Sequence, residues 1–166
     1  MAIKTSYARH MSARQHLLIV AHAPSANTRR LVDAVLRGAR HPDVGTIEAR
    51  WIAPLQADAD DVFDCDALIL GTTENLGYMS GALKDFFDRI YYACLDKTDG
   101  LPYALYVRAG HDGTGTRRAV ASITTGLRWK AVQDPLTCRG EWQEQFVEDC
   151  EQLGLYMAAG LDANVF

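Results

Sequence analysis

Short apolar runs alternate with helix-period patterns along the whole chain from His16 onward. We expect strands at 16–21, 46–52, 66–71, 102–109 and 131–138. We expect helices at 28–39, 79–95, 114–128 and 141–159, with a short helical piece near 56–64. Strands that alternate with helices are joined by right-handed crossovers, which give a mostly parallel sheet covered on both faces. The pattern therefore predicts a three-layer α/β/α sandwich with a five-stranded parallel sheet.

The two longest expected helices carry apolar stripes at three- and four-residue steps. In 79–95 the stripe is Met79, Leu83, Phe86, Phe87, Ile90 and Cys94, and in 141–159 it is Trp142, Phe146, Cys150, Leu153 and Met157. Such stripes are typical of helix faces that pack against a core. We interpret them as core surface, not as a cofactor site.

Composition excludes several classes of protein. The length of 166 residues predicts one domain, at 16–166. The formal net charge of -4 gives the protein no general attraction to nucleic acid or anionic membranes. The first segment, 1–15, is expected to be loosely ordered; it is basic but lacks the apolar centre of a secretory signal. No apolar run approaches the ~20 residues that span a bilayer. A cytoplasmic location is therefore expected.

Cysteine and histidine spacing gives no reason to expect a metal. Cys65, Cys94, Cys138 and Cys150 form no C-x-x-C pair, and the five histidines form no H-x-x-x-H or H-E-x-x-H pattern. No catalytic dyad stands out either. Ser25 with a nearby histidine lacks the G-x-S-x-G elbow, and the glycine-rich loop after 102–109 lacks the Gly-Lys-Ser/Thr ending of a P-loop.

Three polar turns follow the first, third and fourth expected strands: "HAPSANT", "TTENLGYM" and "GHDGTGT". A turn that only reverses the chain needs one or two small polar residues. Each of the three turns contains more Gly, Ser, Thr and Asn than that. In open parallel sheets, ligands bind beyond the carboxyl ends of the strands, where the winding direction reverses. We therefore expect the three turns to share a binding site.

The first of these turns has two interpretations. Ser25, Asn27 and Thr28 stand at the start of the first long helix. Each can act as an N-cap, because its side-chain oxygen can accept a hydrogen bond from an unpaired amide. The same amides, the positive end of the helix dipole and the hydroxyl groups also suit a phosphate. The residues alone leave both interpretations open.

Three stretches resemble the flavodoxin-like superfamily, specifically its small NAD(P)H-dependent FMN reductases and quinone reductases. "HAPSANTRRL" resembles the phosphate loop of that family. "GTTENLGYMSGALKDFFDR" is similar to its Gly-Ser-Pro-x-Tyr-x-Gly-x-Met-Ser-Gly motif and following helix, and this middle match is the most specific. "YVRAGHDGTGTRRAVASITTGLRWKAV" resembles the strand, loop and helix at the far edge of the flavin.

The resemblance implies an FMN site built from the three turns, with NAD(P)H as electron donor. The phosphate would be held by Ser25, Asn27 and Thr28 with the amides that begin at Ala26, and His22 would lie at the mouth of the turn. The ring and its pyrimidine edge would be lined by Thr72, Thr73, Glu74, Asn75, Leu76, Gly77 and Tyr78. The other side of the ring would be flanked by Gly110, His111, Asp112 and Gly113.

The sequence departs from the family pattern in the middle motif. Thr73 stands where the family usually has proline, and Glu74-Asn75-Leu76 stand where it commonly has an aromatic residue. A Glu74 carboxylate facing the ring would disfavour the anionic reduced flavin; a Glu74 facing solvent would leave the flavin unaffected.

Three functions are therefore open. The first is an FMN-dependent oxidoreductase that takes electrons from NAD(P)H and passes them to a quinone, flavin or similar small molecule. The others are a flavodoxin-type electron carrier and a cofactor-free interaction domain. Many reductases of the resembled type pair as dimers, so a second copy of the chain is a candidate partner, with Tyr91, Tyr92 or Trp129 as contacts.

Overall fold

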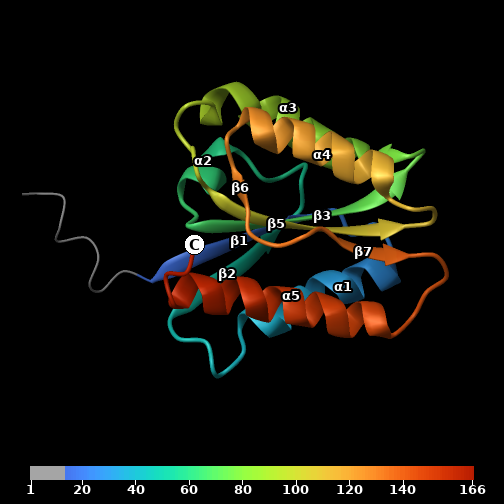
Figure 1. Ribbon diagram of the computed structural model, residues 1–166, viewed down its shortest axis with the longest axis horizontal. Coiled ribbons are helices and arrows are strands. Elements are labelled where there is room, and N and C mark those ends of the chain that lie inside the picture. The colour runs from blue at the N-terminus through green and yellow to red at the C-terminus, as the bar shows by residue number, and fades with distance from the viewer. Residues whose placement is uncertain (1–13) are drawn as a thin grey trace, which may run out of the picture.

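Strands and helices alternate along the chain as the sequence pattern predicts. The computed structural model describes residues 14–166 (Figure 1). The elements are β1 (Gln15–Ala21), α1 (Ala26–Ala39), β2 (Ile47–Ile52), α2 (Ala59–Phe63), β3 (Ala67–Asn75), β4 (Tyr78–Met79), α3 (Gly81–Cys94), β5 (Pro102–Ala109), α4 (Thr114–Gly126), β6 (Lys130–Ala131), β7 (Leu136–Arg139) and α5 (Gln145–Asp162). Most of the expected loose segment, 1–15, lies outside the described residues, and Gln15 already belongs to β1.

The sheet has the strand order β2-β1-β3-β5, and β6 and β7 both pair with β5 on its outer side. All of these pairings are parallel, and only the two-residue β4 pairs antiparallel, with the end of β3. The chain thus winds outward from β1 to the β2 edge and then crosses back to β3. This reversal between β1 and β3 fixes the place where a ligand is expected.

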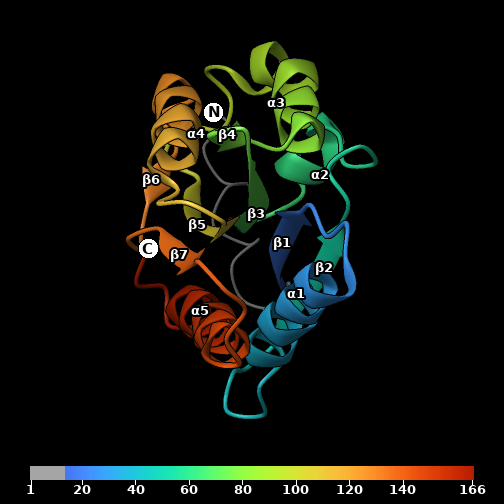
Figure 2. The ribbon, with the colours of Figure 1, turned by 90° about the vertical axis from the view of Figure 1, so that its right-hand side faces the viewer.

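Helices cover both faces of the sheet (Figures 1 and 2). One buried cluster lies between the sheet and α1 and α5, and the other lies between the sheet and α2, α3 and α4. Leu17, Leu18, Ile19 and Val20 of β1 are fully buried, because the strand is covered on both sides. None of the helices within residues 14–166 has the length and apolarity that crossing a membrane requires.

Two glycines let the backbones of α1 and α5 touch. A Cβ atom on Gly38 would lie 1.8 Å from the carbonyl oxygen of Glu151, and one on Gly154 would lie 2.0 Å from that of Val35. Backbone atoms cannot move aside as a flexible side chain can. The helix pair on this face is therefore held at a spacing that a side chain would prevent.

The expected strand 131–138 is wrong as one continuous strand. The chain pairs with β5 at β6, leaves the sheet, and returns at β7 after Pro135. Proline has no N–H to donate, so it does not continue a hydrogen-bonded strand. The two short pieces together occupy the fifth position in the sheet.

Among the other boundaries, two differ from expectation by four residues. β3 continues to Asn75, and the residues predicted as a polar turn form a β-hairpin with β4. α5 begins at Gln145, so Trp142 precedes the helix that it was predicted to join. Its ring instead meets the Phe146 ring edge-on, with 5.8 Å between the ring centres.

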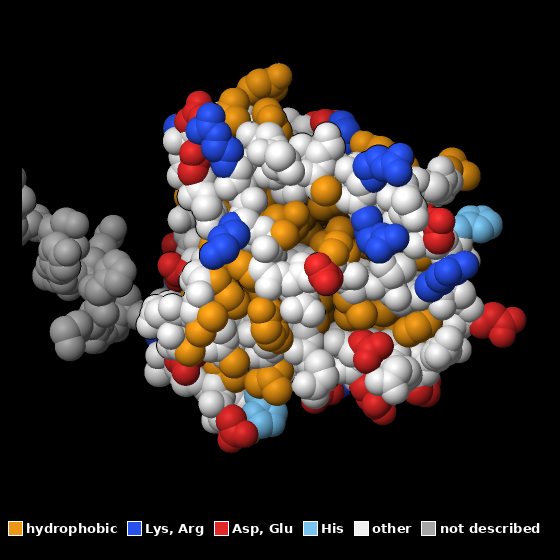
Figure 3. Space-filling view, in the orientation of Figure 1, with side chains coloured by type: hydrophobic (Ala, Val, Ile, Leu, Met, Phe, Trp, Pro, Cys, Tyr) orange, Lys and Arg blue, Asp and Glu red, His pale blue; other side chains and the backbone are white. Residues whose placement is uncertain are grey.

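The aromatic residues expected as dimer contacts differ in exposure. Tyr92 is 82% exposed, whereas Trp129 is only 6% exposed, because its ring packs between those of Phe87 and Tyr103. Trp129 is thus a core residue, and its prediction as a surface contact is wrong. The outer edge of the sheet does present hydrophobic side chains between α4 and α5 (Figure 3), among them Val132 and Leu136.

We predict that Gly154→Ala lowers the free energy of unfolding by about 1–3 kcal/mol, because the added methyl group forces α1 and α5 apart. The control is Gly81→Ala in the first turn of α3, where a Cβ atom meets nothing within 4 Å. That change should be neutral or stabilise by up to about 1 kcal/mol. Urea unfolding of the three proteins measures both effects, and equal stability of the two variants would contradict the tight helix contact.

Candidate functional site

The three polar turns meet at one edge of the sheet, as their positions after parallel strands predict. Ala21 at the end of β1 lies beside Gly71 of β3, and Thr73 of β3 lies beside Arg108 of β5. The amide of His22 donates a 2.9 Å hydrogen bond to the carbonyl oxygen of Gly71. Figure 2 looks onto this edge, with the starts of α1 and α4 and the β3–β4 hairpin around it.

α1 begins with a capping box. The Ser25 hydroxyl accepts a hydrogen bond from the Thr28 amide at 3.2 Å, and the Thr28 hydroxyl accepts one from the Ser25 amide at 2.9 Å. The Thr28 hydroxyl also donates to the Ser25 carbonyl oxygen at 3.0 Å, and its side chain is buried. The capping interpretation is therefore confirmed for Ser25 and Thr28, whereas the Asn27 side chain makes no capping hydrogen bond within residues 14–166. The Thr28 side chain therefore lies on the buried side of the turn, and Ser25 lies on its exposed side.

Anion donors remain at the same turn. Within residues 14–166, the amides of Ala26 and Asn27 make no hydrogen bond, and neither does the exposed Asn27 side chain. Two free amides at the positive end of a 14-residue helix, with a side-chain NH₂ and a hydroxyl beside them, form a donor set that fits a phosphate. The capping box and a phosphate seat are compatible, because the amides of Ala26 and Asn27 and the Asn27 side chain take no part in the box; the Ser25 hydroxyl is the one group that both would share.

His22 lies at the mouth of this turn and is partly buried. Burial lowers the pKa of its imidazole from the ordinary value of 6.5, because desolvation disfavours the charged form. Burial therefore favours the neutral form of the ring. It can donate one hydrogen bond to a ligand at this position without adding a charge.

The second turn is a tight hairpin. Leu76 and Gly77 both have positive φ, 53° and 74°, as a two-residue hairpin turn with matching twist requires. Thr72 is buried at its base, where its hydroxyl accepts from the Ser80 amide at 3.0 Å and donates to the Thr73 carbonyl oxygen at 2.9 Å. The structure thus places Thr72 inside the hairpin base and not on a surface that a ligand could touch.

The hairpin tip exposes apolar side chains. Leu76 is completely exposed, and Tyr78 on the returning strand is 41% exposed. Beside them, the Thr73 hydroxyl donates to the side-chain oxygen of Asn75 at 2.8 Å. The tip therefore offers one aliphatic and one aromatic surface next to the converging turns.

Glu74 takes an orientation that the sequence did not predict. Its carboxylate points neither to solvent nor freely toward the ligand edge. One oxygen accepts from the His111 amide and the other from the Gly113 amide, each at 2.8 Å. The end of β3 is therefore joined to the loop after β5 through a charge-assisted pair of hydrogen bonds.

The third turn is fixed at its far end as well. The Asp112 carboxylate accepts from the Thr114 amide at 2.9 Å, and Gly113 precedes α4 with a φ of 70°. Hydrogen bonding from Thr114 lowers the pKa of Asp112, and the positive charges of Arg139 and Arg117 lower it further. Gly110 stands in open space, because an added Cβ would meet nothing within 4 Å.

Basic residues around the third turn were missed by the sequence interpretation. Arg108 donates to the carbonyl oxygens of Ala109, Cys138 and Gly140 at 2.7–3.0 Å, which ties the end of β5 to β7. The Arg117 Nε in the first turn of α4 is buried without a partner among the described residues. The "TRR" directly after the glycine-rich loop was the available signal for a basic border.

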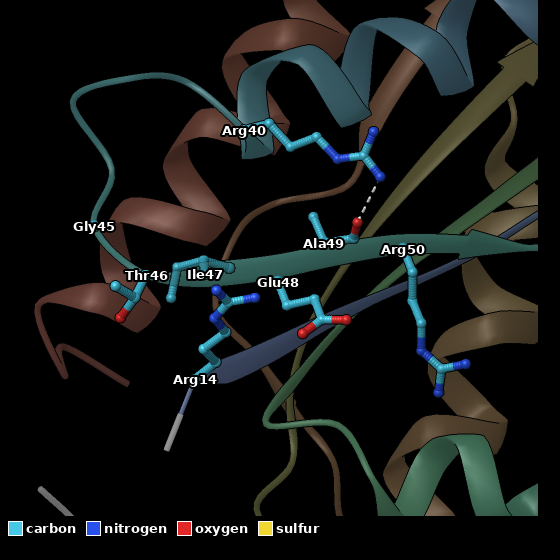
Figure 4. Close-up of a pocket in the computed structure, with 8 residues that line it drawn as sticks. All are labelled: Arg14, Arg40, Gly45, Thr46, Ile47, Glu48, Ala49 and Arg50. Carbon is cyan, nitrogen blue, oxygen red and sulfur yellow. Dashed lines mark hydrogen bonds between the residues drawn. The ribbon is translucent and has the colours of Figure 1, made fainter. Parts of the chain in front are cut away.

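A surface hollow lies at the opposite, amino end of the sheet (Figure 4). It has a volume of about 640 Å³ and is lined by Arg14, Arg40, Gly45, Thr46, Ile47, Glu48, Ala49 and Arg50. Arg40 reaches from the end of α1 and donates to the Ala49 carbonyl oxygen at 2.7 Å, and Arg50 pairs with Asp61 at 2.9 Å. These two arginines are engaged within the protein, and the hollow shares no residue with the three turns.

Comparison with known proteins identifies the fold. No family model matches the chain. A curated protein named flavodoxin from Aquifex aeolicus (strain VF5) is 27% identical over 111 residues, which are 67% of this chain and 59% of that protein. The chain thus matches about three fifths of the length of this relative.

Three solved structures match over nearly their whole length. A flavodoxin from the domain Archaea has a TM-score of 0.75 at 16% identity, covering 90% of this chain and 99% of that one. A flavodoxin, WrbA-like protein from Agrobacterium tumefaciens has a TM-score of 0.69 at 18% identity, covering 90% and 98%. Two-electron reduced flavodoxin from Megasphaera elsdenii has a TM-score of 0.70 at 15% identity, covering 86% and 98%.

These matches, together with the strand order, show that the chain has the flavodoxin-like fold. The fold class predicted from the sequence is therefore confirmed. At these identities the structures establish the architecture, and the chemistry must be argued from the residues of this chain.

Proposed function

We propose that this protein binds FMN at the edge where the three turns meet and works as an NAD(P)H-dependent oxidoreductase for a quinone, flavin or similar small acceptor. The observation that carries the FMN site is that the amides of Ala26 and Asn27, at the start of α1, make no hydrogen bond within residues 14–166. They lie at the reversal point between β1 and β3. The flavodoxin relative and the flavodoxin structures support the same cofactor.

The residues divide the work between the two ends of the flavin. Ser25 and Asn27 would hold the phosphate with the amides of Ala26 and Asn27, and His22 would add one neutral hydrogen bond. The ring would lie toward the β3–β4 hairpin and the loop after β5, with Leu76 and Tyr78 as apolar surface. When bound, FMN supplies hydride and electron transfer; the protein supplies orientation and exclusion of water.

The charge around the third turn supports the reductase over an electron carrier. Three arginines stand around this turn, Arg108, Arg117 and Arg139, and they outnumber the two carboxylates of Glu74 and Asp112. NAD(P)H is anionic through its phosphates, so a basic border favours its approach. An electron carrier that docks through an acidic surface would need negative charge around this turn.

An electron carrier is the second candidate, and the curated relative named flavodoxin favours it. The two functions differ in what reduces the flavin. We predict that NADH or NADPH, added in the absence of oxygen and of any other protein, reduces the bound FMN. The visible absorbance of the flavin should then bleach at a rate fast enough for catalysis. Bleaching by dithionite but by neither nucleotide would favour the carrier, and a protein that retains no FMN would favour the cofactor-free domain.

We predict that Asn27→Ala weakens FMN binding about tenfold, because a hydrogen bond to a charged phosphate is worth ~1.5 kcal/mol or more. Riboflavin has no phosphate and should bind both proteins equally. Stability should not change, since the Asn27 side chain is exposed and makes no hydrogen bond within residues 14–166. Fluorescence titration with both flavins is the measurement, and equal losses for FMN and riboflavin would contradict a phosphate contact.

A further inference from the structure

Glu74 joins two parts of the site that are far apart in sequence. It lies near the end of β3, and both of its carboxylate oxygens are used, one by the His111 amide and one by the Gly113 amide, at 2.8 Å each. The hairpin also touches the first turn of α4, because a Cβ atom on Gly115 would lie 2.0 Å from the Gly77 carbonyl oxygen. The hairpin and the loop after β5 therefore form one fixed unit.

The carboxylate takes every second amide of the four-residue loop 110–113. The amides of Gly110 and Asp112 make no hydrogen bond within the described part of the chain. Both residues are exposed, and the space around Gly110 is open. The Glu74 hydrogen bonds thus fix the loop in a conformation that leaves two donors free at the ligand edge.

We propose that Glu74 is a positioning residue for the ring end of the flavin site: it holds the amides of His111 and Gly113, so that those of Gly110 and Asp112 stay aimed at acceptor atoms of the ring. This proposal rests on the proposed FMN site. It gives Glu74 a role opposite to that of a carboxylate facing the flavin, since its charge is engaged by protein donors.

The side chain has to be a carboxylate for this role. A glutamine of the same length has one oxygen and one NH₂ group, so one loop amide would face a donor instead of an acceptor. Glu74→Gln therefore breaks one of the two hydrogen bonds with little change in volume. A control with the same change of charge is Glu141→Gln, since Glu141 is exposed and makes no hydrogen bond within residues 14–166.

The test compares the wild type and both variants in three measurements. Titrations give the affinities for FMN, riboflavin and inorganic phosphate; the visible circular dichroism of bound flavin reports the ring environment; and amide hydrogen exchange without flavin reports the loop. We expect Glu74→Gln to weaken FMN and riboflavin by the same factor, about tenfold, because the change acts at the ring end. Glu74→Gln should also alter the visible circular dichroism of bound flavin and speed amide exchange at His111 and Gly113, while its affinity for phosphate stays unchanged. Glu141→Gln should behave like the wild type in all three measurements.

The outcomes separate this proposal from the proposed function. Binding of FMN by the wild type with unchanged affinity in Glu74→Gln overturns the positioning role and leaves the FMN site standing. A loss for FMN without a loss for riboflavin, or a parallel loss of phosphate binding, also overturns it, because the effect would then lie at α1 or in the fold. No binding of FMN by the wild type overturns the proposed function, and the positioning role with it.

Discussion

The parallel pairing of β1, β3 and β5 is the constraint on which the rest of the structure depends. It brings three turns, separated by about fifty and forty residues of chain, to one edge of the sheet, and it buries β1 so completely that its register cannot slip without exposing the core. The helices on either face then fix where α1 and α4 begin. The site is therefore a product of sheet topology more than of any local motif.

The polar groups at this edge of the sheet fall into two sets: those that make hydrogen bonds within the turns, and those that stay available to a ligand. The side chains of Thr28, Thr72 and Glu74 make hydrogen bonds to backbone groups of the turns. Asn27 and the amide of Ala26 are left without partners in the described chain. A rigid edge with selected free donors is what a preorganised binding site requires, because the donors lose little freedom when a ligand binds.

Sequence patterns predicted the architecture because strand and helix periodicity is local. The five strand positions, the five helices and the convergence of the turns all follow from such patterns. Pro135 was the visible signal that the last strand is interrupted, and Leu76-Gly77 was the signal for the hairpin. The partners of Glu74 could not be predicted, because they are amides 37 and 39 residues away whose direction depends on the loop conformation. Burial of Trp129 likewise depends on packing against Phe87 and Tyr103.

Two-dimensional ¹H–¹⁵N NMR during titration with FMN can locate the flavin on the protein residue by residue. We expect the largest shifts on the amides of Ala26, Asn27, Gly110 and Asp112, around the three turns. Riboflavin should reproduce the shifts at Gly110 and Asp112 and leave Ala26 and Asn27 close to their free positions. Shifts confined to residues 45–50 at the opposite end of the sheet, or no saturable shifts at all, would show that FMN does not bind at the three turns.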